Sequence, residues 1–205
     1  MSLNNFTAFE IVLYCAELLL LIIGSISDVK HRRIPLWLGI ASVVLGLVSL
    51  LYGKHYWMAV FFAVGVFAPS FPLLQVLMLV LVFPIFSAEG AACLPFVLGL
   101  LLILYFFKMK MIGGGDTQML FGMYGIAYRG WTLSILIAAI TILTGIFTSI
   151  KVFGFKKSIS RIPIIAKSMF RKNEIEHDAE KIKTPFLLIL TEAWAIFGII
   201  KLFVH

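Results

Sequence analysis

Residues 56 to 88 read YWMAVFFAVGVFAPSFPLLQVLMLVLVFPIFSA and contain no Asp, Glu, Lys, Arg or His in 33 positions. A helix needs about 20 mostly apolar residues to cross a membrane, so this stretch is longer than one straight span requires. Pro69 and Pro72 interrupt it in the middle. Because proline removes a backbone hydrogen bond inside a helix, we expect either two short helices, over 56–69 and 72–87, or one long kinked helix.

The rest of the chain has the same apolar character. Of its 205 residues, 61% are hydrophobic and only 13% are charged, and the mean hydropathy is +1.06. Soluble domains carry about 25% charged residues, so this composition excludes an ordinary soluble domain and argues against nucleic-acid binding. We expect an all-α integral membrane protein, a polytopic bundle of transmembrane helices. The further apolar segments are 8–27, 34–53, 90–107, 117–128, 130–150 and 184–203, of which 117–128 is short.

The basic residues predict how the chain is oriented, because short loops rich in Lys and Arg stay in the cytoplasm. Most of them cluster in residues 30–33, 108–110 and 151–183. Placing all three clusters in the cytoplasm gives eight spans, with both termini outside and 151–183 as a basic cytoplasmic loop of a single domain, 1–205. Six spans satisfy the same constraint if residues 34–110 cross only twice. We expect a multi-pass protein of the inner (cytoplasmic) membrane, whose first helix is retained because it lacks a basic signal-peptide region.

Two aspartates stand out among the few acids beyond that loop. Asp28 and Asp116 both lie at expected cytoplasmic helix ends, and ionisable groups close to a membrane are functional candidates. Two neighbouring carboxyls can hydrolyse a peptide bond, because the ionised one takes a proton from water while its protonated partner polarises the carbonyl. A structural interpretation stays open for each: Asp28 pairs with the basic residues at 30–33, and Asp116 caps a helix.

The residues beside the aspartates suggest substrate positioning. Gly113, Gly114 and Gly115 directly precede Asp116. Glycine permits positive φ and lacks a Cβ, so a substrate strand can approach its backbone. Pro35 lies where the helix after Asp28 begins, and proline suits the first turn of a helix. We assign the three glycines and Pro35 to substrate binding or positioning.

Together, Ser27-Asp28-Val-Lys-His-Arg-Arg-Ile-Pro35 and Gly113-Gly-Gly-Asp116 resemble the type IV prepilin peptidase family. Its members carry one Asp shortly before an Ile-Pro-Asn helix start and a second in a Gly-x-Gly-Asp motif. The resemblance implies a polytopic aspartic endopeptidase with Asp28 and Asp116 as its catalytic pair. Such an enzyme removes, at the cytoplasmic face, the basic leader of a pilin-like precursor with an apolar N-terminal helix. Lys183-Thr-Pro185-Phe186 is similar to the segment that opens the family's last helix.

Some positions depart from the family pattern. Leu36 stands where the family has Asn, Gln118 stands where it has Lys, and the two aspartates are 88 residues apart, which is longer than usual. These changes leave open a membrane scaffold with a degenerate motif. The first helix begins near residue 8, so the expected form is the short, peptidase-only one, similar to enzymes of tight-adherence pili or archaeal flagellin-like filaments.

Other acids suggest a second class of function. Glu17 and Glu192 lie inside apolar segments and, with Asp116, would form the proton or cation path of a small transporter; a structural hydrogen bond between helices is the other interpretation of Glu17. Glu89 is expected to be a solvated residue of an external turn. No His or Cys cluster has metal-ligand spacing, so we expect neither metal nor cofactor. The expected partners are the pilin-like precursor and membrane lipids, not nucleic acid.

Overall fold

The computed structural model describes residues 7–31, 34–69, 71–108, 112–128, 131–153 and 186–203. These ranges consist of helices and short turns without any β-strand, so the all-α class is confirmed for the described residues. Residues 151–153 are helical, so the loop expected at 151–183 does not begin at its predicted boundary. The rest of that loop lies outside the described residues, as do Arg32, Arg33, Lys110 and the segment 183–185.

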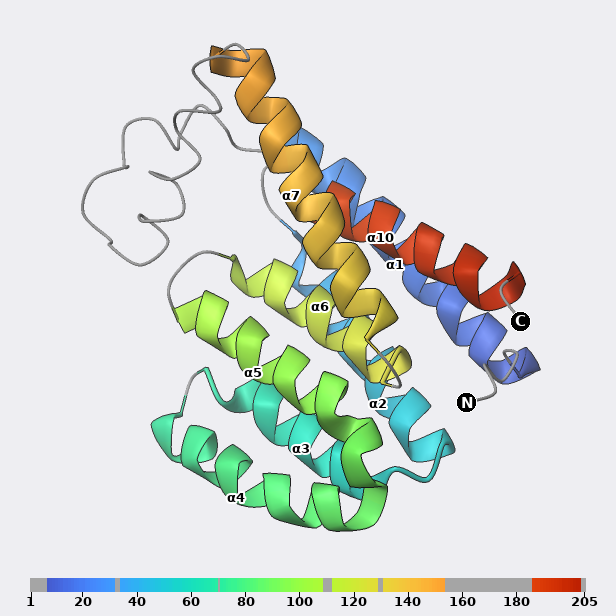
Figure 1. Ribbon diagram of the computed structural model, residues 1–205, viewed down its shortest axis with the longest axis vertical. Coiled ribbons are helices and arrows are strands. Elements are labelled where there is room, and N and C mark those ends of the chain that lie inside the picture. The colour runs from blue at the N-terminus through green and yellow to red at the C-terminus, as the bar shows by residue number, and fades with distance from the viewer. Residues whose placement is uncertain are drawn as a thin grey trace.

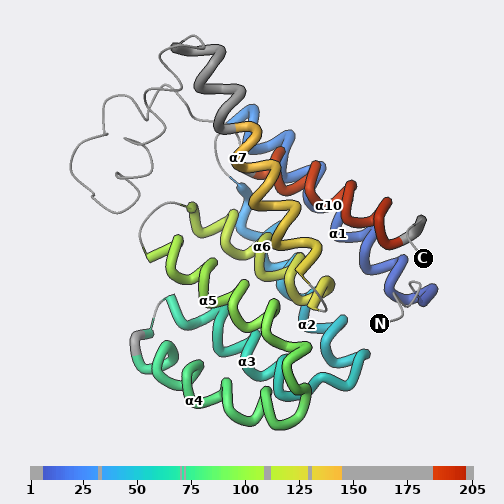
Figure 2. The backbone as a smooth tube through the Cα atoms, viewed as in Figure 1, coloured from blue at the N-terminus to red at the C-terminus, as the bar shows by residue number. Residues whose placement is uncertain are grey.

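Successive helices run back and forth across a bundle (Figures 1 and 2). In chain order they are α1 (Ala8–His31), α2 (Leu36–Tyr52), α3 (Tyr56–Phe67), α4 (Pro72–Glu89), the 3₁₀ helix η1 (Gly90–Cys93), α5 (Leu94–Lys108), α6 (Gly114–Ile126), α7 (Thr132–Phe153) and α10 (Phe186–Phe203).

The charge-free stretch at 56–88 forms two helices, so the first of the two alternatives is confirmed. α3 ends at Phe67, and Pro72 is the first residue of α4, where its missing N–H costs no intrahelical bond. The amide of Gln75 donates a hydrogen bond to the Ala68 carbonyl at 3.2 Å and links the start of α4 to the end of α3. Pro84 lies inside α4 without ending it.

Within the described residues, two helical stretches are long and apolar enough to cross a membrane, Ala8–His31 and Leu73–Lys108. The second spans α4, η1 and α5, and Figure 1 shows that the chain turns back at η1. Large apolar side chains project from α4, including Leu73 and Phe83, which are 80% and 81% exposed. Exposed apolar surface of this kind is suited to lipid, so these features indicate a membrane protein.

α6 lies inside the bundle and packs on α1, α2, α3, α5 and α10. All residues of 117–126 except Gln118 are buried, as expected of a helix with neighbours on every side. Its most extensive contact is with α2. A Cβ on Gly46 would lie 2.9 Å from the carbonyl oxygen of Gly122, and one on Gly125 would lie 2.6 Å from the Cα of Gly46. Such small residues let helix backbones approach closely within a membrane.

This close approach predicts a large effect of one added methyl group. A Cβ at Gly122 would overlap the side chain and backbone of Ser42, so Gly122→Ala should lower the free energy of unfolding by about 1–3 kcal/mol. Gly114→Ala is the matched control, because its Cβ would meet only Phe107, at an ordinary 3.9 Å. Thermal unfolding of both variants in detergent measures the difference. Equal stability of the two variants would contradict the α2–α6 packing.

Candidate active site

Asp28 continues the inward face of α1. Glu17, Leu21 and Gly24 are buried and recur every three or four residues, which places them on one side of the helix. Asp28 follows Gly24 by four residues and is partly buried near the carboxyl end of α1. The periodicity of α1 therefore turns this carboxyl toward the other helices.

Asp116 is the third residue of α6. Its Oδ2 accepts a hydrogen bond from the backbone N–H of Gly113 at 3.2 Å, while the Thr117 hydroxyl donates to the Gly113 carbonyl at 2.8 Å. The other carboxyl oxygen, Oδ1, is buried and has no hydrogen-bond partner. The first turn of α6 thus holds Oδ2 of the Asp116 carboxyl by a hydrogen bond and leaves Oδ1 without a partner.

Contacts and charge bring the two aspartate motifs together. Ile34 packs over Gly115, where a Cβ would lie 2.8 Å from the Ile34 Cβ. Asp116 lies at the start of α6, outside the two stretches long enough to cross a membrane. Burial raises the pKa of Asp116, the N–H of Gly113 lowers it, and the nearby charge of Asp28 raises it. The segment that follows Asp28 and the first turn of α6 are therefore in contact.

The structural interpretations of the two aspartates find limited support. Among the described residues no salt bridge joins Asp28 to Lys30, and the other basic residues of that cluster, 32 and 33, lie outside the described part of the chain. Gly113, not Asp116, is the N-cap of α6, so the capping interpretation is wrong about the position. Asp116 still stabilises the helix start, because its carboxylate accepts the N-cap N–H and is favourable near a helix amino terminus.

The glycines and Pro35 act differently from the expectation. Gly113 has φ −77°, and among the described residues only Lys54 and Gly90 have positive φ, so the glycine run does not use the left-handed region. What it provides is close approach, since Ile34 occupies the space that a side chain at position 115 would need. Pro35 is the N-cap of α2 rather than part of its first turn, with its carbonyl accepting the N–H of Leu38 at 3.1 Å.

A buried hydrogen bond links α1 to α2, and the same hydroxyl group of α2 also contacts α6. Glu17 is fully buried, and its Oε1 accepts a hydrogen bond from the Ser42 hydroxyl at 2.5 Å. The Ser42 Oγ also lies 3.3 Å from the carbonyl oxygen of Met119. The interhelical hydrogen bond expected of Glu17 is therefore confirmed. Sequence reasoning missed Ser42, although its spacing from Gly39 and Gly46 marks one small-residue face of α2.

Buried oxygens without partners gather on the helices that carry the aspartates. Within the described residues they are Glu17 Oε2, Asp116 Oδ1 and Gln118 Oε1. Gln118 packs over Gly39 of α2, where a Cβ would lie 2.8 Å from its own Cβ. Native structures contain few such unsatisfied groups, and functional sites are among the places where they persist. The buried oxygens that lack hydrogen-bond partners in the described residues therefore lie on α1 and α6.

The other acids have different surroundings. Glu192 is exposed on α10, whereas Glu17 is buried against α2, so the two acids of the transporter hypothesis do not share one environment. Glu89 is the last residue of α4 and lies 2.6 Å from the Nδ1 of His55, beside which the ring of Tyr128 packs. The expectation that Glu89 is a solvated turn residue is wrong, because its carboxylate holds this interhelical contact.

Within the described part of the chain, no three His, Cys, Asp or Glu side chains gather so as to hold a metal ion. No protein-family model, curated protein or solved structure matches the chain. The aspartate motifs and their geometry are therefore the features that bear on function.

The bond between Glu17 and Ser42 predicts the stability of the site. Ser42→Ala leaves a fully buried carboxyl without its donor, which should lower the free energy of unfolding by about 1–3 kcal/mol. Thr141→Ala is the control, because that exposed hydroxyl donates only to the Ile137 carbonyl in its own helix. Reversible unfolding in mixed micelles reports both values. A Ser42→Ala protein as stable as Thr141→Ala would show that the bond contributes nothing.

Proposed function

We propose that this protein is a membrane-embedded aspartic endopeptidase of the prepilin peptidase type, which removes the N-terminal leader of type IV pilin-like precursors. The observation that carries the proposal is the contact of Ile34 with Gly115, which brings together the segments that carry Asp28 and Asp116, 88 residues apart in the sequence. The unpartnered Oδ1 of Asp116 adds to it, because a hydrolytic acid needs an oxygen that no structural bond occupies.

The two carboxyls have different roles in this proposal. In this mechanism Asp116 is the acid that holds the shared proton, because burial raises its pKa, and Asp28 is the base. Because Oδ2 of Asp116 accepts the Gly113 N–H, the proton resides on Oδ1. Asp28 takes a proton from water, the resulting hydroxide attacks the scissile carbonyl, and Asp116 donates its proton to the carbonyl oxygen. When the tetrahedral intermediate collapses, the C–N bond breaks and the leaving amine takes the proton that Asp28 removed from water. A hydroxyl of the intermediate returns a proton to Asp116 as the new carbonyl forms.

The same proposal specifies how protein and substrate sit in the membrane. The helices form a bundle of six to eight spans, and the basic clusters at 30–33 and 108–110 place both aspartates at the cytoplasmic face. The precursor's apolar N-terminal helix lies in the same membrane, so only the peptide bond between leader and helix needs to reach the site. Ile34 packs over Gly115 beside Asp116, where the missing Cβ leaves room for the Ile34 side chain, so this contact positions the first turn of α6.

Removing either carboxyl should abolish cleavage. Asp28→Asn and Asp116→Asn each keep the side-chain volume but lose the proton transfers, so leader removal from a co-expressed pilin-like precursor should fall at least about 100-fold. Glu192→Gln is the matched control, because it changes an exposed acid on α10 that the proposal does not use. Processing is read from the mobility of the precursor on gels. Continued processing by both Asn variants would disprove the peptidase, and proton flux in liposomes that requires Glu17 and Glu192 would favour the transporter.

The shared proton predicts the pH dependence of cleavage. At low pH both carboxyls are protonated and the base is lost, whereas above the pKa of Asp116 the acid is lost, so kcat/KM follows a bell-shaped curve. Because burial and Asp28 raise the pKa of Asp116, the alkaline limb should lie above the ordinary range of an Asp carboxyl. A purified enzyme assayed on a leader peptide in detergent gives the curve. An activity that does not change with pH is incompatible with the dyad.

A further inference from the structure

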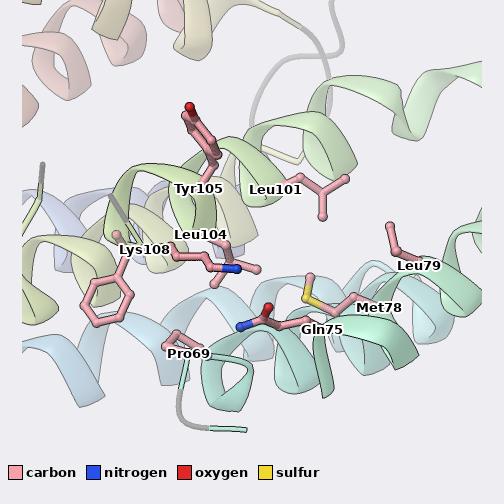
Figure 3. Close-up of a pocket in the computed structure, with 9 residues that line it drawn as sticks. Pro69, Gln75, Met78, Leu79, Leu101, Leu104, Tyr105 and Lys108 are labelled. Atoms are coloured by element: carbon pink, nitrogen blue, oxygen red, sulfur yellow. The ribbon is translucent and has the colours of Figure 1, made fainter. Parts of the chain in front are cut away.

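A groove of about 380 Å³ lies between α4 and α5, away from the α1 side of α6 (Figures 1 and 3). α4 and α5 each pack on α3, and η1 joins them at the far end. Gln75, near the start of α4, and Lys108, the last residue of α5, lie at the same end of the groove.

The groove has apolar walls and one basic residue at its end. Met78 and Leu79 line it from α4, and Leu101 and Leu104 line it from α5. Figure 3 shows the Lys108 side chain extending between the two helices toward α4. Among the described residues no carboxylate pairs with this ammonium group. A ligand for this groove therefore needs an anionic group at one end and an apolar chain behind it.

The position of Lys108 matches the level of lipid phosphates. The apolar stretch long enough to cross a membrane ends at this residue, and lysines at such ends extend toward the head-group region. An acyl chain suits the groove better than a protein helix does, because a helix with its side chains is about 10–12 Å across and an acyl chain is much narrower.

We propose that this groove binds an anionic phospholipid, with one acyl chain between α4 and α5 and its phosphate on Lys108. Basic pockets between membrane helices select anionic head groups through the charge of the cation, while the apolar walls hold the chain. The aspartates do not line this groove, and the proposal does not depend on the proposed peptidase activity.

Native mass spectrometry of the purified full-length protein tests the head-group contact. The protein is mixed with equal amounts of phosphatidylglycerol and phosphatidylcholine of identical acyl chains, and the ratio of the two retained lipids is measured. Lys108→Gln should lower that ratio about fivefold, the effect of one cation near the surface. Lys201→Gln, at the end of α10 and outside the groove, should leave the ratio unchanged. A ratio that Lys108→Gln does not change, or that both variants lower equally, would overturn the proposal.

A second variant tests the apolar part of the site. Leu79 lines the groove and is 60% exposed, so Leu79→Trp fills the space without disturbing the core. It should reduce retention of both lipids while leaving their ratio as in the wild type. Retention of phosphatidylglycerol at the wild-type level in this variant would show that the lipid binds elsewhere.

Discussion

The close contact between α2 and α6 is the constraint on which the site depends. Gly46 of α2 meets Gly122 and Gly125 of α6 with no side chain between the backbones. Because the two helices begin beside each other, the same register lays Ile34 over Gly115 at their amino ends. A larger residue in this contact would separate the helices and move Asp116 away from the α1 side of the bundle.

Polar groups inside this apolar bundle are few, and hydrogen bonds between some of them join particular helices. The Glu17 carboxyl and the Ser42 hydroxyl fix α1 against α2 at one level. One turn earlier on α1, the Tyr14 hydroxyl donates to the Trp194 carbonyl and the Trp194 indole donates to the Tyr14 carbonyl, which fixes α10. Apolar packing alone is poorly directional in lipid, so such bonds determine how α1 is rotated. The rotation of α1 in turn decides whether Asp28 faces Asp116 or lipid.

The sequence predicted the features that follow from local patterns. Charge-free runs indicated the helices, and Pro69 and Pro72 indicated the break between α3 and α4, which the structure confirms. The pairing of Asp28 with Asp116 was expected from two helix-end motifs and a resemblance. Sequence reasoning could not assign partners across helices: Ser42 for Glu17, or His55 for Glu89, because these contacts depend on how the helices rotate and pack.

The role of the glycine run was misjudged for a related reason. Three successive glycines suggest a turn with positive φ, yet α6 begins at Gly114 and its N-cap has ordinary backbone angles. The need for a missing side chain at position 115 arises from Ile34, which lies 81 residues earlier, just before α2. Such a requirement is a property of the packed interface and has no signal in the local sequence.

The two ends of α6 are held differently, and this difference bears on how a substrate reaches the site. At the carboxyl end, Tyr124 shares a hydrogen bond with Ser134, and Tyr128 packs on His55, whose ring contacts Glu89. At the amino end, Gly113 and Gly114 are exposed. Regions with few buried contacts open at the lowest free-energy cost, so adjustment of α6 is concentrated in its first turn. In the proposed peptidase, the turn that carries Asp116 would adjust to a substrate backbone while the rest of the helix keeps its register with α2.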